Sequence, residues 1–96
     1  MTDRGLLELA SKAAGLSVAW FDGFSVGWYD PARGTTGHWN PLDDDGDALR
    51  LAVRLGILLR TDFIKALAQL LNSGMDHQAA TRLAVVRIAA EIGKIH

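Results

Sequence analysis

The densest group of side chains that could do chemistry in this chain is a run of four aspartates within five residues. They are Asp43, Asp44, Asp45 and Asp47. Closely spaced carboxylates can bind a divalent cation, and a calcium loop needs alternating oxygen ligands, a glycine at position six and a glutamate at position twelve. With Gly46 at position six, Pro41 and Ala52 take positions one and twelve. Neither can supply the required ligand, so we expect no metal site here.

The same acidic run is typical of a helix start. An aspartate side chain accepts hydrogen bonds from unpaired backbone N–H groups, and its charge suits the positive end of the helix dipole. Because Gly56 is placed as a left-handed terminator, we predict a helix from about 44 to 55. Leu49, Ala52 and Val53 are expected on its apolar face. The run also carries local negative charge, so its four aspartates are candidate residues for binding a basic partner.

The remaining chemistry is sparse. The three histidines, His38, His77 and His96, are too widely separated for a metal-binding pair, and there is no cysteine. No nucleophile elbow, phosphate loop or dinucleotide fingerprint occurs. We therefore expect a non-enzymatic protein with no catalytic residue, cofactor or metal. A small enzyme or ligand binder is kept as an alternative.

Residues 17–29 are predicted to form a β-hairpin. Asp22-Gly23 is a preferred two-residue turn of type I′,. This turn places Phe21 opposite Phe24 and Ala19 opposite Val26. Thr35 to Trp39 can add a third strand. Large apolar residues fall on both faces of such a sheet, which favours helices on both sides or a partner on one face.

All three tryptophans, Trp20, Trp28 and Trp39, lie in this sheet region. We interpret them mainly as core residues. Trp28 and its neighbour Tyr29 adjoin a polar turn and are expected to be partly exposed. Because such aromatic residues anchor binding surfaces, both are further candidates for contact with a partner.

Helices are predicted at both ends of the chain. The first covers 3–14, with Thr2 or Asp3 as its cap and Gly15 as its terminator,. The last covers 77–92, with Asp76 as its cap and Gly93 after it. It is apolar over so much of its surface that we expect it to be largely buried or to lie in a dimer interface.

Two stretches of the chain resemble the phage ABA sandwich domain, a family of small phage and prophage proteins. The first is Trp-Asn-Pro-Leu at 39–42 with Asp-Asp-Gly-Asp-Ala-Leu-Arg-Leu-Ala-Val-Arg-Leu-Gly at 44–56, and the second is the helical run 79–93. The resemblance implies an α-β-α layered sandwich of phage origin. The family has no assigned activity, so no functional residues are carried over.

The chain departs from this family at 57–74. The family resemblance implies strand there, whereas the local pattern favours a short strand at Ile57–Thr61 and then a helix from Phe63 to Leu71 capped by Asp62. We take the helix. The predicted fold is α+β, a three-layer α-β-α sandwich with a small, mainly antiparallel sheet and three to four helices, in a single domain over residues 1–96.

Composition narrows the function further. The net charge is −1, which argues against non-specific nucleic-acid binding. No apolar run approaches the roughly 20 residues of a membrane span. The N-terminal segment is amphipathic, unlike a signal peptide. We expect a protein of the host bacterial cytoplasm, with no direct nucleic-acid or membrane partner.

These observations predict a small phage-encoded accessory protein that acts by protein–protein binding. The sharpest version is an inhibitor of a host defence complex, similar to an anti-CRISPR, whose partner is a basic host protein or protein complex. The alternative is a self-associating structural or assembly protein of a phage, for which a homodimer is the simplest form.

Overall fold

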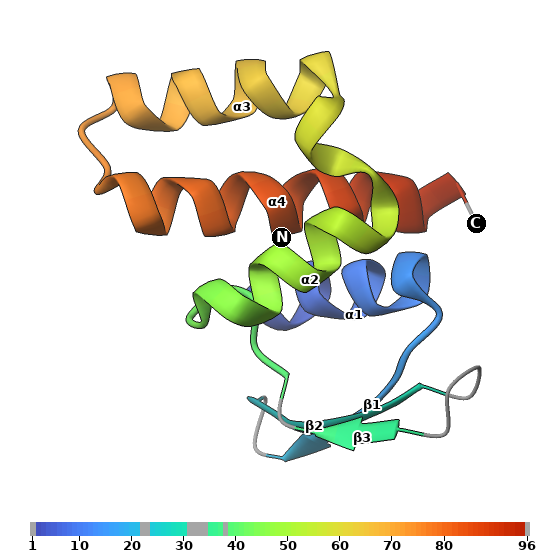
Figure 1. Ribbon diagram of the computed structural model, residues 1–96. Helices are drawn as coiled ribbons and strands as arrows, with labels where there is room; N and C mark the ends of the chain where they lie inside the picture. Colours follow the sequence, from blue (N-terminus) through green and yellow to red (C-terminus); the bar gives the residue numbers. More distant parts are fainter. Residues whose placement is uncertain (1, 22–23, 31–34, 38, 96) are drawn as a thin grey trace.

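The computed structural model describes residues 2–21, 24–30, 35–37 and 39–95, with the backbone alone for the strand residues from 19 onward. Its helices and strands are shown in Figure 1. In chain order they are α1 (Asp3–Ala14), β1 (Ser17–Phe21), β2 (Phe24–Asp30), β3 (Thr35–Gly37), α2 (Asp45–Leu55), the 3-10 turn η1 (Ile57–Leu59), α3 (Thr61–Asn72) and α4 (His77–Ile95).

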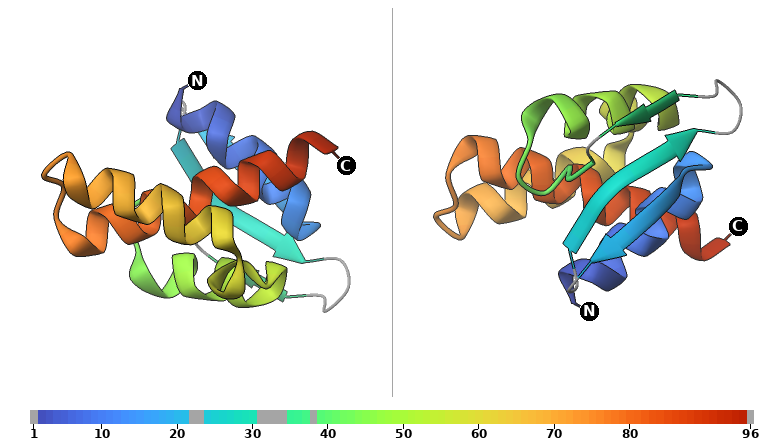
Figure 2. Two further views of the ribbon diagram at one scale, coloured as in Figure 1. Left: turned by 90° about the horizontal axis from the view of Figure 1, so that it is seen from above. Right: turned by 90° about the horizontal axis from the view of Figure 1, so that it is seen from below.

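The C-terminal helix α4 is the centre of the molecule. Helices α1, α2 and α3 all pack against it, as Figure 2 shows from two sides. Its buried residues are Ala80, Ala84, Val85, Val86, Ile88, Ala89, Ala90 and Gly93. The expectation that this helix is largely buried is confirmed. The reason is visible in the sequence, because small and β-branched residues cover more than one face of the helix.

The ends of α4 agree only in part with the sequence prediction. Asp76 accepts hydrogen bonds from the backbone N–H groups of Gln78 and Ala79, both at 3.1 Å, as expected of a cap. Gly93 does not end the helix, however, since α4 continues to Ile95. Gly93 is buried against α1, where an added Cβ would lie 2.0 Å from the carbonyl oxygen of Leu9. This glycine allows two helices to approach closely, and its backbone is helical.

The predicted three-layer α-β-α sandwich is wrong. All four described helices lie on one side of the small sheet, whose other face carries no helix (Figures 1 and 2). The described core is formed by the helices, by Ile57 of η1 and by Trp39 after β3. The physical reason is the segment 57–74. It forms helix α3 and packs on α4, away from the sheet, so the fold is a helical core with a sheet at its edge.

The hairpin prediction is confirmed and its register is partly wrong. The sheet is antiparallel, in the order β1-β2-β3. Phe21 pairs with Phe24, as predicted. An irregularity between Ala19 and Trp20 then shifts the register, so that Ala19 pairs with Gly27 instead of Val26. A bulge inserts one extra residue into one strand, which a register counted from the turn cannot anticipate. The turn residues 22–23 lie outside the described part.

The first helix has the predicted boundaries. The Thr2 hydroxyl accepts a hydrogen bond from the backbone N–H of Gly5 at 3.0 Å. Gly15 adopts φ 71°, the left-handed conformation that ends many helices,. Leu7, Ala10 and Ala14 on this helix are buried in the core. Local capping chemistry and the apolar stripe therefore agree with the tertiary structure here.

The strand predicted at 57–61 is absent from the described structure, where Ile57–Leu59 form a 3-10 turn and α3 begins at Thr61. Asp62 is therefore inside α3 and does not cap it from outside. Its two carboxylate oxygens accept hydrogen bonds from Nε and Nη2 of Arg60, each at 2.9 Å. These bonds hold the pKa of Asp62 below its ordinary value of 3.8. The helix prediction for this segment is nevertheless confirmed, against the strand implied by the family resemblance.

Replacing Asp62 with asparagine should change how stability depends on acid pH. A carboxylate whose pKa is lowered by folding stabilises the protein above its unfolded pKa, and this contribution is lost as the pH falls through the folded pKa. We expect the melting temperature of the wild type to fall more than that of Asp62→Asn as the pH falls below 3.8. The difference should be small because the pair is exposed. Equal acid sensitivity of the two proteins would contradict the assignment.

Candidate functional site

The acidic run 43–47 begins helix α2, as predicted. The Asp44 carboxylate accepts a hydrogen bond from the backbone N–H of Asp47 at 2.8 Å. At the other end, Gly56 adopts φ 66° and closes the helix. Both ends are therefore satisfied by the local sequence, which is why a helix from about 44 to 55 could be predicted from residue types.

Asp47 has a structural role inside this run. It is only 7% exposed. One carboxylate oxygen accepts the backbone N–H of Asn40 at 2.9 Å, and the other accepts Nη2 of Arg50 at 2.5 Å. The Asn40 side chain in turn binds Asp43, donating from Nδ2 at 3.0 Å. The loop that leads into α2 is thus fastened to the first turn of the helix.

Replacing Asp47 with alanine should destabilise the fold by about 2 kcal/mol, because the part-buried N–H of Asn40 loses its acceptor and Arg50 loses its ion-pair partner,. Asp47→Asn keeps an acceptor oxygen of similar shape but loses the charge facing Arg50. We expect it to lose less than half as much stability in urea-induced unfolding followed by circular dichroism. If the two variants unfold at the same urea concentration, loss of the hydrogen bond to Asn40 is not the cause of the destabilisation.

Asp45 joins α2 to the central helix. Its carboxylate pairs with Nη1 of Arg82 at 2.5 Å, and Nε of the same guanidinium donates to the carbonyl oxygen of Leu42 at 2.9 Å. The Arg82 side chain is only 19% exposed. The sequence reading did not identify Arg82, because its partners are about 40 positions away in the chain.

The acidic run is therefore largely committed to holding the fold. Arg50 and Arg82 neutralise Asp47 and Asp45. Asp43 and Asp44 remain exposed carboxylates, with Arg50 lying 3.9 Å from Asp44. No group of three or more His, Cys, Asp or Glu side chains in the described ranges is arranged to hold a metal ion.

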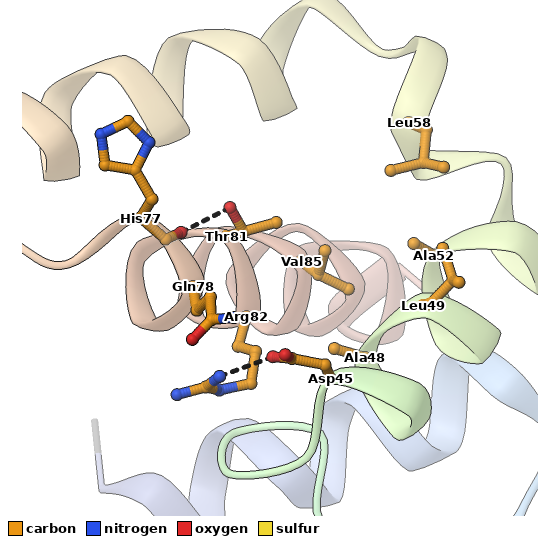
Figure 3. A pocket seen from close by; sticks show the side chains of 10 residues that line it. All are labelled: Asp45, Ala48, Leu49, Ala52, Leu58, His77, Gln78, Thr81, Arg82 and Val85. Atoms are coloured by element: carbon orange, nitrogen blue, oxygen red, sulfur yellow. Dashed lines mark hydrogen bonds and ion pairs between the residues drawn. The ribbon is translucent and has the colours of Figure 1, made fainter.

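Beside the acidic run lies an apolar groove of about 290 Å³, drawn in Figure 3. Helix α2 forms one wall, η1 closes one end and the first half of α4 forms the floor. The lining residues are Asp45, Ala48, Leu49, Ala52, Leu58, His77, Gln78, Thr81, Arg82 and Val85. The apolar side chains gather toward η1 and the polar ones toward the start of α4. The surface that lines the groove is mainly apolar, with a few polar groups at one end, which is a common form of a peptide or ligand site,.

The groove lies where η1 joins α2 to α3. Both helices pack on α4, and they diverge away from η1 (Figure 1). The groove is lined by α2, η1 and the first half of α4, with Leu58 at one end and His77 at the other (Figure 3).

Leu49 and Leu58 mark the groove as an open surface, with exposures of 57% and 43%. Leu49 and Val53 were predicted on the buried face of α2, and this is wrong, since Val53 is 65% exposed. Ala52 is buried, as predicted, and its buried neighbours on this helix are Ala48 and Leu51. The helix has more apolar residues than one buried face requires. That surplus was the available signal for an exposed apolar surface.

The exposed apolar side chains form one stretch of the chain. Among the described residues, the large exposed hydrophobic side chains are Leu49, Val53, Leu58, Leu59, Ile64 and Ile95. All but Ile95 lie between positions 49 and 64, on α2, η1 and α3. We call these five residues the 49–64 apolar surface. Single exposed leucines are common in soluble proteins, whereas a concentrated group is typical of an interaction site.

The other predicted partner-binding residues are not brought to this groove. Trp28 and Tyr29 lie in β2, paired with Val18 and Ser17 of β1, and their side chains lie outside the described part. The sheet is on the opposite side of α2 from α3 (Figure 1). His38 and His96 also lie outside the described residues, while His77 is on the groove rim.

None of the described helices has the length and apolar character needed to cross a membrane. Comparison with protein-family models, with curated proteins and with solved structures gives no match. The resemblance to the phage family therefore stays a prediction, and the function is argued from the groove and its surroundings.

Proposed function

We propose that this protein is a non-enzymatic protein-binding module and that the groove between α2, η1 and α4 is its contact surface. The observation that supports this is the open apolar groove, lined by the half-exposed Leu49 and Leu58 and rimmed by Asp45 and Arg82. A partner side chain placed there would remove apolar surface from water while polar groups at the rim fix its orientation.

The expected gain from occupying the groove is substantial. Burying a leucine side chain fully contributes about 1.5–3 kcal/mol, so covering the exposed parts of Leu49 and Leu58 contributes about half of that for each. Matching contacts on the partner add to it. A few such anchors usually supply most of an interface's affinity.

The acidic run contributes less to this proposal than the sequence suggested. Asp45 and Asp47 are paired with arginines of the same chain. Asp43 and Asp44 are the two carboxylates left to attract a basic partner, and they lie just before the groove wall at the start of α2. We therefore propose an apolar contact in the groove, with a basic group of the partner beside Asp43 and Asp44.

A narrower version makes the chain a phage accessory protein that inhibits a host defence complex in the bacterial cytoplasm. It is motivated by the family resemblance alone. That resemblance also implied the sandwich fold that the structure contradicts, so our proposal depends on the groove and not on the resemblance.

The proposal is tested by affinity purification of the tagged protein from a bacterial lysate, with three variants compared with the wild type. Leu49→Glu puts a charge into the groove at a half-exposed position that should not affect folding. Ile95→Glu makes the same kind of change at an exposed apolar residue at the C-terminal end. Asp43→Lys reverses an exposed charge without removing the cap of α2 or the partner of Arg82.

We expect a stoichiometric partner that binds the wild type and Ile95→Glu but not Leu49→Glu. Asp43→Lys should retain binding with a weaker dependence on salt, because rim charges mainly affect association rate and salt sensitivity. A partner that binds Leu49→Glu as well as the wild type would overturn the assignment of the groove.

A further inference from the structure

We infer that the groove binds a second copy of this chain, with the outer face of α3 from each copy seated in the groove of the other. This inference depends on the proposed role of the groove as a protein-binding surface. The inference adds the identity of the partner. The experiments below can reject a second copy as the partner without rejecting the groove as a protein-binding surface.

The first observation is that the 49–64 apolar surface contains both a groove and a ridge. Leu49 and Leu58 line the groove. Leu59, at 94% exposure, and Ile64, at 58%, project from η1 and α3 and do not line it. A hollow and a projection of similar chemistry on one chain provide both halves of an interface.

The second observation is that the two halves are neighbours. The turn η1 carries Leu58 of the groove and Leu59 of the ridge, and α3 follows directly from it. A two-fold axis near η1 would therefore place each ridge over the other copy's groove in a single arrangement. Two-fold dimers are the commonest closed oligomers, and they use the same surface on both subunits.

The third observation is charge complementarity between ridge and groove. Lys65 follows Ile64 on the exposed side of α3, and no described carboxylate forms an ion pair with it. The start of the groove wall carries Asp44, whose side chain is 60% exposed, and the exposed Asp43. Because Arg50 and Arg82 balance only Asp47 and Asp45, this end of the groove has a net negative charge. Asp44 precedes Leu49 by five residues, about 7.5 Å along the axis, so contact between Ile64 and Leu49 would bring Lys65 toward the Asp43 and Asp44 carboxylates of the other copy.

The test uses the full chain and two complementary variants. Sedimentation equilibrium of the wild type, from about 1 to 100 µM, covers the range in which a micromolar dimer forms. We expect the mass to approach twice the monomer value of 10.4 kDa. Leu49→Glu and Ile64→Lys should each weaken association at least tenfold, whereas Ile95→Glu should leave it unchanged. Circular dichroism checks that each variant is folded.

Mixing the two variants tests the reciprocal geometry. In a Leu49→Glu homodimer each glutamate faces Ile64, and in an Ile64→Lys homodimer each lysine faces Leu49. A mixed dimer has one glutamate–lysine contact and one wild-type contact between Leu49 and Ile64. We therefore expect an equimolar mixture to recover the dimer mass that neither variant reaches alone. No recovery on mixing would overturn the reciprocal arrangement.

The outcomes also separate this inference from the proposed function. A wild type that is monomeric up to about 100 µM overturns the second copy as partner. If the wild type is monomeric but still captures a partner in the affinity purification, and Leu49→Glu abolishes that capture, the groove remains a binding surface for another protein. A dimer that is unaffected by both Leu49→Glu and Ile64→Lys overturns the inference, because association then uses a different surface.

Discussion

Replacing Gly93 with alanine is expected to cause one of the largest losses of stability in this protein. An added Cβ would lie 2.0 Å from the carbonyl oxygen of Leu9 and 2.8 Å from its carbonyl carbon. Both atoms belong to the backbone of α1, so no side-chain rotation can relieve the clash. Helix α1 would have to move away from α4, and these two helices form the most extensive contact between elements of the fold.

We expect Gly93→Ala to lower the free energy of unfolding by about 3 kcal/mol or more, at the upper end of overpacking effects. Alanine is the better helix former by about 1 kcal/mol, so any loss seen is a lower limit for the clash. The measurement is urea-induced unfolding followed by circular dichroism.

Gly46→Ala provides the matched control, since Gly46 also lies in a helix. Its added Cβ would meet only the side chains of Asp44 and Arg50, at 3.1 and 3.2 Å, and these can shift. We expect a change of less than about 1 kcal/mol. If Gly93→Ala were as stable as Gly46→Ala, the close approach of α1 and α4 would be refuted.

The second large effect is expected at Trp39. It follows β3 and precedes α2, yet it is only 5% exposed and belongs to the same core as Leu51 and Ile57. Its side chain therefore anchors the end of the sheet to the helices. Trp39→Ala should lower the free energy of unfolding by about 3–5 kcal/mol, the range observed for removing a large aromatic side chain from a core. Stabilities of small domains are only about 5–15 kcal/mol, so a large part of the stability would be lost.

Trp39→Phe tests whether an aromatic ring of smaller size is enough to fill this position of the core. It keeps an aromatic ring in the core and leaves a smaller cavity, and we expect it to cost about 1–2 kcal/mol. Hydrogen exchange adds a local measurement. In Trp39→Ala the backbone amides of β2 and β3 should exchange faster relative to those of α4, because the sheet loses an attachment to the core. Equal acceleration in sheet and helices would show that Trp39 supports the whole fold and is not a specific anchor of the sheet.

The folding of a single chain does not require the 49–64 apolar surface to be apolar. Leu59 and Ile64 could be replaced by polar residues without disturbing the buried face of α3, which consists of Phe63 and Leu70. Their apolar character is therefore unexplained by the folding of a single chain. The proposed contact with another protein molecule would account for this apolar character.

Local chemistry allowed most helix boundaries to be predicted from the sequence. Thr2 and Gly15, Asp44 and Gly56, and Asp76 all act where the sequence placed them. These are interactions within a few residues, so they depend on residue type and spacing alone. The turn Asp22-Gly23 likewise predicted a hairpin, although only the two pairs nearest the turn keep the predicted register.

The local pattern correctly predicted a helix for most of 57–74, although the short strand that it favoured at 57–61 is wrong, since Ile57–Leu59 form a 3-10 turn. The consequence of this helix for the whole fold was not drawn. A helix in place of a strand removes one member of the sheet and adds a layer on α4, which excludes the sandwich implied by the family resemblance. The sequence contains the apolar spacing of α3, but it does not say against which face of the molecule that helix packs.

The sequence by itself determined the helices, the hairpin and the capping role of the aspartates, because each depends on neighbours along the chain. Only the tertiary structure decided that the four described helices lie on one side of the sheet, that Gly93 is a contact point and that Arg82 neutralises Asp45. It also decided that Leu49 is exposed and lines a groove. These features depend on residues tens of positions apart, and their meeting is set by how the helices pack around α4.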